Sequence, residues 1–336
     1  MLKNTPSKER EQSRHSDLVG VDFSTTATKI VRLKQSKGAI SLSGLDLLPA
    51  VDFNTESTKL QLPRNLSSNY GCLAYTGKRA VVRMINTPVA DGDGGLANEK
   101  IQELLNVTRE FRVSARLIQR NSGREDSSFL AAAIPDEDAE YLLSLFPSGP
   151  PAPASLEISG LSFVSAFLHA RGSECADSTV CIMEAGEMVS HFAFVTNGLV
   201  TLVGKLPVGA QMLREKVAQD LGLDEDLAAS ILSDASINIS SSIAGVLAPF
   251  IKQISISKDF IERHQGQRIS RIYLSGGLSL LPSWGVEVEK LLGAQVAYWS
   301  PLENIEYDPA SIPADMVKQA TRFSAAIGAA IGGFEA

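Results

Sequence analysis

Residues 271–282, RIYLSGGLSLLP, are the stretch that decides the fold of this chain. Residues 272–274 combine β-branched, aromatic and aliphatic side chains, which is the composition of a buried strand. Residues 275–277 (SGG) end that strand, and a helix is expected over residues 280–292. Two successive glycines let the backbone adopt positive φ angles and let another group approach closely. A strand, a glycine turn and a helix N-terminus favour a nucleotide site, although a plain connecting loop would also carry these glycines.

The composition of the chain is that of a globular protein with room for two domains. It has 336 residues, of which 44% are hydrophobic and 21% charged, as is ordinary for folded proteins. The formal net charge of −7 argues against nucleic acid as a partner, because that binding rests on neutralising phosphates with Lys and Arg. Cys72, Cys175 and Cys181 lack metal-ligand spacing and fit a reduced, intracellular compartment.

The sequence carries no recognisable targeting or membrane-spanning segment. Residues 1–16 are polar and charged, which predicts a disordered tail and not a signal peptide. No stretch reaches the roughly 18 consecutive apolar residues of a membrane span. We therefore expect a cytoplasmic protein whose contact with a membrane depends on a partner.

One succession of strands and turns occurs twice along the chain. In each copy a strand ends in an acid, a turn of small residues leads to a second strand, and a glycine hairpin leads to a third. The first copy covers residues 18–45 with the acid at Asp22, and the second covers residues 179–206 with the acid at Glu184. Such a repeat predicts two duplicated α/β domains, although β-meanders also recur by chance.

Residues 85–150 separate the two copies and combine helical and strand patterns. Apolar residues at helical spacing predict a helix over 97–111, and two apolar runs predict strands over 115–119 and 129–134. Asp136 is expected to cap a following helix. This segment is therefore predicted to be a small α+β subdomain, followed by a proline-rich linker.

Two later helices carry small residues at every fourth position. They are expected over residues 160–170 and 319–332. The small residues are Ser162, Ala166 and Ala170 in the first helix and Ser324, Gly328 and Gly332 in the second. Small side chains let two helix axes approach closely, so these helices are predicted to cross along the two rows.

Four stretches together resemble the fold shared by actin, hexokinase and DnaK-type ATPases, and within it the PilM family of type IV pilus assembly proteins, with FtsA next. Residues 19–33 (VGVDFSTTATKIVRL) resemble the first phosphate loop of the family. Residues 207–223 (PVGAQMLREKVAQDLGL) resemble its glycine-led helix, and residues 323–333 (FSAAIGAAIGG) its C-terminal helix. Residues 271–282 are similar to its adenosine loop and are the most specific match. The likeness covers nearly the whole chain after residue 17.

The resemblance implies an α/β protein of actin-like ATPase fold, with two duplicated domains and a small α+β subdomain inserted in the first. The implied boundaries are a disordered tail at 1–16, a first domain at 17–84 and 151–176, the insertion at 85–150, a second domain at 177–314 with a helical subdomain near 207–266, and a C-terminal helix at 315–336 that returns to the first domain.

The resemblance also implies an ATP site, with Mg²⁺ held through water by Asp22. Its residues would be Asp22, Ser24, Thr25, Thr26, Lys29, Glu184, Gly186, Gly209, Gln253, Gly276, Gly277 and Leu278. Asp22 and Glu184 would otherwise serve as turn acids, and Lys29 as a solvated charge on its strand. Ser24 departs from the family pattern by replacing a glycine, and Glu187 places a carboxylate beside the phosphates, where like charges repel. ATP binding would therefore be degenerate.

The function implied by the resemblance is that of a cytoplasmic scaffold of type IV pilus assembly or related secretion, at most a weak ATPase. Its partner would be the cytoplasmic N-terminal peptide of an inner-membrane pilus protein, bound in the groove between the first domain and the insertion. An FtsA-like division protein and a small-molecule kinase of the same superfamily stay open as alternatives. Residues 45–49 (LDLLP) resemble the bound peptide; they either end the third strand or support self-association.

Overall fold

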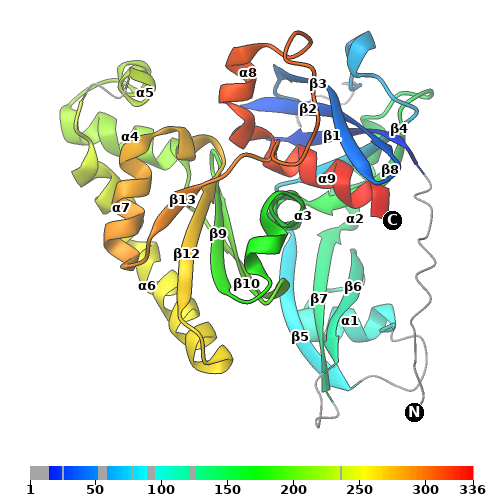
Figure 1. The fold of residues 1–336 in the computed structure, drawn as a ribbon, viewed down its shortest axis with the longest axis horizontal. Coiled ribbons are helices and arrows are strands. Elements are labelled where there is room, and N and C mark those ends of the chain that lie inside the picture. Colours follow the sequence, from blue (N-terminus) through cyan, green and yellow to red (C-terminus); the bar gives the residue numbers. More distant parts are fainter. Residues whose placement is uncertain are drawn as a thin grey trace.

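The computed structural model describes residues 15–24, 26–51, 59–77, 79–88, 95–120, 126–234 and 237–335. Residues 1–14 of the tail predicted at 1–16, and the candidate site residue Thr25, lie outside the described residues. Figure 1 shows the second domain on the left, the first domain at the upper right and the inserted subdomain at the lower right.

Two five-stranded sheets with the same topology form the two domains. The first is ordered β3-β2-β1-β4-β8 and the second β11-β10-β9-β12-β13, and each joins an antiparallel meander to two parallel strands. The strands are β1 Asp17–Phe23, β2 Ala27–Ser36, β3 Ala39–Pro49, β4 Tyr70–Tyr75 and β8 Ala152–Ile158, then β9 Thr179–Ala185, β10 Ser190–Thr196, β11 Leu199–Leu206, β12 Ile269–Ser275 and β13 Val296–Tyr298. The predicted duplication is therefore confirmed.

The meanders turn where the glycine hairpins were expected. Gly38 and Gly198 both have positive φ angles, as do Lys37 and Asn197 before them. Positive φ at both central positions suits a tight hairpin between right-twisted strands. Residues 45–49 form the end of β3, where Pro49 lies opposite Ala27 of β2, so the peptide-like segment is the end of a strand.

The inserted subdomain contains a three-stranded sheet and two helices, one between its first two strands in sequence and one after its last. Its elements are β5 Val81–Pro88, α1 Asn98–Leu105, β6 Phe111–Arg120, β7 Asp126–Pro135 and α2 Asp136–Ser144, with strand order β5-β7-β6. The helix predicted over 97–111 is too long, because Asn106 adopts a left-handed φ of 56° and Phe111 begins β6. The prediction that Asp136 caps the next helix is wrong, because Pro135 is the N-cap residue and Asp136 lies in the first turn of α2.

Helices cover the two large sheets and fill the space between them. They are α3 Ser159–Arg171, α4 Ala210–Leu221, α5 Glu225–Asp234, α6 Ser240–Gln265, α7 Pro282–Leu292, α8 Ala314–Lys318 and α9 Ser324–Glu335. The helix expected from residue 280 begins at Pro282, after a 3₁₀ turn over Gly277–Leu280. The helix expected from residue 319 begins as a 3₁₀ turn and becomes α-helical at Ser324. Among the described helices, none has the length and apolar character needed to span a bilayer.

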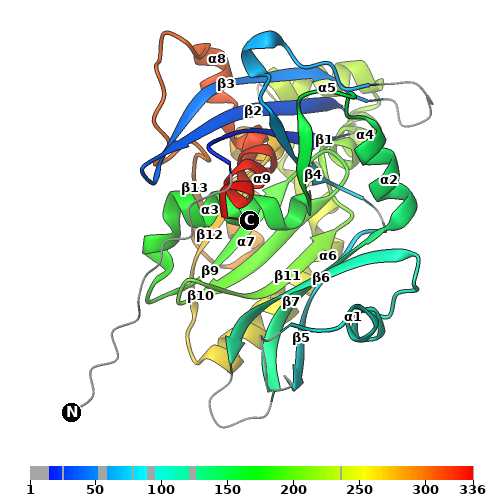
Figure 2. The ribbon, with the colours of Figure 1, turned by 90° about the vertical axis from the view of Figure 1, so that its right-hand side faces the viewer.

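The close crossing of α3 and α9 is confirmed. A Cβ atom on Gly328 would lie 1.6 Å from the carbonyl oxygen of Ser162, so only glycine lets the two backbones meet there. On the other side of α9, a Cβ atom on Gly20 of β1 would lie 2.0 Å from the carbonyl oxygen of Ala326. Figure 2 shows α3 and α9 side by side between the two sheets. At Gly332, the last small residue of the row on α9, a Cβ atom would meet the side chain of Glu157 and not the backbone of α3.

Candidate functional site

A small cavity lies where the first turns of the two meanders face each other. Its volume is about 110 Å³. Both domains line it, through Asp22, Phe23, Ser24, Lys29, Tyr75, Thr76, Ser159, Glu184, Gly186, Glu187, Met188, Val189 and His191. The duplicated fold therefore brings together the two acids that the sequence pattern singled out.

The carboxylate of Asp22 is fully engaged by neighbouring side chains. Asp22 is only 3% exposed, and Lys29 faces it directly across the β1–β2 pair. The Lys29 Nζ donates to Asp22 Oδ2 at 2.7 Å, and the Ser159 hydroxyl donates to Oδ1 at 3.2 Å. Lys29 is thus a largely buried counter-charge to Asp22 and not a solvated lysine, because pairing compensates a buried carboxylate.

The second domain repeats this arrangement with Glu184 and His191. These buried residues lie opposite each other across the β9–β10 pair, and His191 Nδ1 is 3.4 Å from Glu184 Oε2. A Cβ atom on Gly160 would come within 2.5 Å of the His191 ring. No role was predicted for His191, yet it follows its acid by seven positions, as Lys29 does. That equal spacing within the repeat is the signal that could have found it.

The carboxylate of Glu187 is also paired. It forms an ion pair with Arg214 of α4, which removes the repulsion expected from a free acid at this place. Gly209 packs closely under this turn, because a Cβ atom there would lie 2.2 Å from the Glu187 carbonyl oxygen. The turn is held further by the amides of Gly186 and Ala210, which donate to Val189 and Gly186 carbonyl oxygens.

Most of the other predicted site residues do not line the cavity beside Asp22. Ser24 does line it, but its hydroxyl donates to the carbonyl of Ala27, and Thr26 is exposed. Gln253 is exposed on α6 and Leu278 belongs to the core of the second domain.

The double glycine at the end of β12 has two different environments. Gly276 has a φ of 84°, and a Cβ atom there would lie 2.4 Å from the carbonyl oxygen of Ala185. Backbone packing within the second domain therefore requires a glycine at position 276. A Cβ atom on Gly277 would meet nothing within 4 Å, so this residue borders open space.

These contacts do not fit a bound triphosphate and Mg²⁺ in this arrangement. Ligand pockets usually have volumes of about 300 to 1,000 Å³, several times that of the cavity at Asp22. Three acids line the cavity, and each has a basic partner already. Within the described residues there is also no group of three or more His, Cys, Asp or Glu side chains that could hold a metal ion. A nucleotide would have to open these pairs before it could bind.

Lys205 of β11 joins the second domain to the base of the inserted subdomain. Its Nζ donates to the carbonyl oxygens of Gly77 and Ala80, each at 3.2 Å, and burial lowers the pKa of its amine. The two acceptors belong to the segment that connects β4 to β5. Lys205 therefore links the second domain to the segment that leads into the inserted subdomain.

Replacing Lys205 by methionine is expected to loosen this junction while leaving the fold intact. Two buried hydrogen bonds are lost, each worth about 1 kcal/mol, so amides of Ala80 to Val82 should exchange with solvent faster. Hydrogen exchange followed by mass spectrometry measures this. The exposed Lys318→Met variant is the control. Unchanged exchange over residues 80–82 in Lys205→Met would contradict the assignment.

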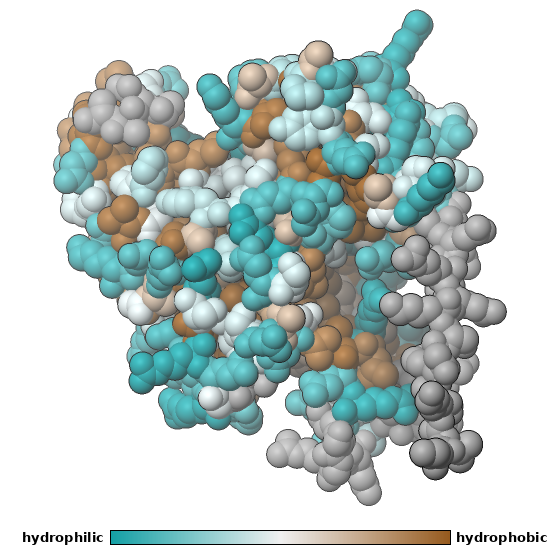
Figure 3. Space-filling model, in the orientation of Figure 1, coloured by the Kyte–Doolittle hydropathy of each residue, from teal (hydrophilic) through white to brown (hydrophobic). Residues whose placement is uncertain are grey.

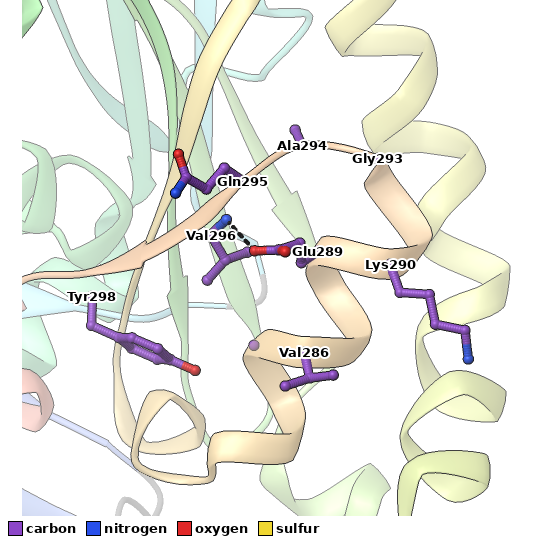
Figure 4. Close-up of a pocket in the computed structure, with 9 residues that line it drawn as sticks. Val286, Glu289, Lys290, Gly293, Ala294, Gln295, Val296 and Tyr298 are labelled. Carbon is purple, nitrogen blue, oxygen red and sulfur yellow. Dashed lines mark hydrogen bonds between the residues drawn. The ribbon is translucent and has the colours of Figure 1, made fainter.

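An open cavity of the second domain lies at the edge of its sheet (Figure 4). Its volume is about 660 Å³, and it lies between α7 and β13. Glu289 Oε2 accepts a hydrogen bond from the Val296 amide at 2.8 Å, and the Tyr298 ring lies against Gly285. The Glu289 carboxylate thus occupies one amide of the edge strand β13, and blocking an edge in this way hinders strand addition.

A groove of about 490 Å³ separates the inserted subdomain from the first domain. One wall is formed by β6 and β7 of the inserted subdomain, through Arg112, Val113, Ser114, Arg116, Leu130, Ala132 and Ile134. The opposite wall is formed by Leu156, Glu157, Ile158, Leu161, Ser165, Gly332 and Glu335. Ala139 and Leu143 of α2 form the end of the groove. Figure 3 shows a recess bordered by hydrophobic surface between the lower lobe and the body above it. The family resemblance implied a peptide site at this position, between the first domain and the insertion.

Comparisons with known proteins agree with this architecture. The family model described as type IV pilus assembly protein PilM matches residues 162–334. The structure described as a PilM-PilN type IV pilus biogenesis complex is similar with a TM-score of 0.77 at 18% identity, over 95% of this chain and 99% of that chain. The chain thus has the predicted actin-like ATPase fold.

More distant likenesses extend to other proteins. The ethanolamine utilization protein EutJ from Carboxydothermus hydrogenoformans has a TM-score of 0.44 at 16% identity, over 93% of this chain and 88% of that chain. The archaeal actin homolog Ta0583, in complex with ADP, has a TM-score of 0.45 at 13% identity, over 95% of this chain and 100% of that chain. No curated protein sequence matches the chain significantly.

Proposed function

Because this chain belongs to the type IV pilus assembly protein PilM family, we propose that it is a cytoplasmic scaffold of pilus assembly that binds the N-terminal cytoplasmic peptide of an inner-membrane pilus protein. The peptide lies in the groove between the first domain and the inserted subdomain. Through it the chain is peripheral to the inner membrane. A similar structure is described as a complex of PilM with PilN, which supports a pilus protein as the partner.

The observation that carries this proposal is the groove itself. Its floor and walls are largely aliphatic, with Leu130, Ala132 and Ile134 on the sheet face and Leu156 and Leu161 opposite. Several of these side chains are only partly buried, so apolar surface stays available to a ligand. An extended peptide presents alternate side chains to the two sides of such a groove, and apolar pockets then give specificity.

The contacts near Asp22 favour a binding protein over an enzyme. Phosphoryl transfer requires a bound metal and phosphate-binding groups aimed at the transferred phosphoryl. Here the acids of the cavity are paired with Lys29, His191 and Arg214. We therefore infer that the scaffold works without hydrolysis, and that ATP is at most a weak ligand.

A titration with the synthetic N-terminal cytoplasmic peptide of the inner-membrane pilus protein from the same organism tests the proposal. The Ala132→Glu variant places a long charged side chain on the groove wall and should weaken binding by at least about tenfold. Fluorescence anisotropy with a labelled peptide gives the affinities.

The control is Val286→Glu, because Val286 is 63% exposed on α7 and lines the other large cavity. It should bind like the wild type. Equal affinities of the wild type and Ala132→Glu would contradict the groove as the peptide site.

A further inference from the structure

Building on the proposed peptide site, we propose that Glu157 is a specificity-determining residue of the groove, which accepts a hydrogen bond from a donor or cationic side chain of the peptide. Glu157 lies near the end of β8, the edge strand of the first sheet. It is one of two acids on the wall opposite the sheet face of the inserted subdomain.

The geometry leaves one Glu157 oxygen for a ligand. Oε2 accepts a hydrogen bond from the Ser162 hydroxyl at 2.9 Å. Oε1 lies beside Gly332, close enough that a Cβ atom there would be 2.6 Å away. Among the described residues no basic side chain forms an ion pair with Glu157. The carboxylate is thus half-buried, uncompensated in charge and part of the groove lining.

The charged groups around the groove are arranged by wall. Arg112 and Arg116 are on the sheet face, and Glu335 of α9 is beside Glu157. Arg112 is paired with Asp136 and Glu140, whereas Arg116 has no ion pair within the described residues. On β4, behind Glu157, burial raises the pKa of the Cys72 thiol to about 11, so it stays neutral. A peptide would therefore meet a cationic wall and an acidic wall.

A ligand lying over Glu157 must compensate its carboxylate. Removing water from an ionised carboxyl group without supplying a donor is costly, whereas a charge-assisted hydrogen bond is strong. Burial raises the pKa of Glu157 in the free protein to about 7, with a further contribution from Glu335. A donor from the peptide favours the ionised form and lowers that pKa, so binding releases a proton. Affinity should then increase as the pH rises through 7.

The experiment measures the affinity of an acetylated, histidine-free version of the same synthetic peptide between pH 6 and pH 8. If only ionised Glu157 binds well, affinity at pH 8 should exceed that at pH 6 by about tenfold. The Glu157→Gln variant keeps the shape but cannot ionise, and should show no pH dependence. Glu335→Gln removes the exposed acid of the same wall, and this variant should keep most of the pH dependence of binding.

The outcomes separate this inference from the proposed function. Absence of binding at every pH would overturn the proposed peptide site and this inference with it. Binding without pH dependence, or with a pH dependence that persists in Glu157→Gln, would overturn only the role of Glu157. Tighter binding at pH 6 than at pH 8 would mean that apolar groups cover the neutral acid, and would also overturn it.

Discussion

Replacing Gly328 by alanine should destabilise the protein by about 3 kcal/mol, which is the upper end of the usual cost of overpacking a closely packed contact. The new methyl group would occupy the place of the Ser162 carbonyl oxygen, 1.6 Å away. Both partners are backbone atoms or fixed to the backbone, so neither can rotate aside. The gain of about 1 kcal/mol in helix propensity from glycine to alanine cannot offset the separation of α3 from α9.

Urea unfolding followed by circular dichroism measures this loss. Gly172→Ala is the matched control, because Gly172 follows α3 with a helical φ of −56° and its nearest contact would be an ordinary 3.9 Å to Leu168. The control should be as stable as the wild type. If Gly328→Ala unfolds at the wild-type urea concentration, the two helices do not meet at this residue.

Replacing Lys29 by methionine should destabilise the protein by about 3 to 5 kcal/mol, the usual result of breaking a buried ion pair from one side. Methionine preserves the length and apolar stem of lysine but leaves the Asp22 carboxylate with the Ser159 hydroxyl alone. Because Asp22 is 3% exposed, water cannot replace the lost ammonium group. Urea unfolding followed by circular dichroism again gives the change in stability.

The double variant Asp22→Asn with Lys29→Met distinguishes a charge effect from a packing effect. Without either charge, most of the stability should return, as replacement of a buried pair by uncharged groups is often nearly neutral. A double variant no more stable than Lys29→Met would show that the pair acts through packing. Melting with and without Mg-ATP adds a second readout, and we expect the nucleotide to leave the wild-type Tm almost unchanged.

Local patterns in the sequence predicted much of the fold. The alternation of residues 18–45 and 179–206 located both meanders, and the small residues of α3 and α9 indicated a helix crossing. Errors fell at helix ends, as at Asn106, where a single left-handed residue stops a helix that its apolar spacing would continue. Where such a helix ends depends on the strand that follows it, and helix propensity alone does not account for that context.

The candidate site was predicted less completely than the fold. Asp22 and Glu184 were both assigned to the implied ATP site, and both line the cavity between the two domains. Their pairing with basic side chains was not foreseen: Lys29 was expected either at the nucleotide or in solvent, and His191 was given no role. A lysine on a strand has the same local pattern whether it faces water or a buried acid, because its environment depends on what packs above the strand.

The sequence by itself determined the duplicated strands, the glycine turns and the rows of small residues, because these depend on neighbours a few positions apart. Only the tertiary structure decided which charges meet and where a ligand could lie. The Asp22 carboxylate accepts a hydrogen bond from Ser159, 137 positions away in the sequence, and Lys205 donates one to the carbonyl of Gly77, 128 positions away. Packing of distant segments therefore closes the cavity at Asp22 and opens the groove at Glu157, since burial and charge compensation are set by contacts that no local pattern specifies.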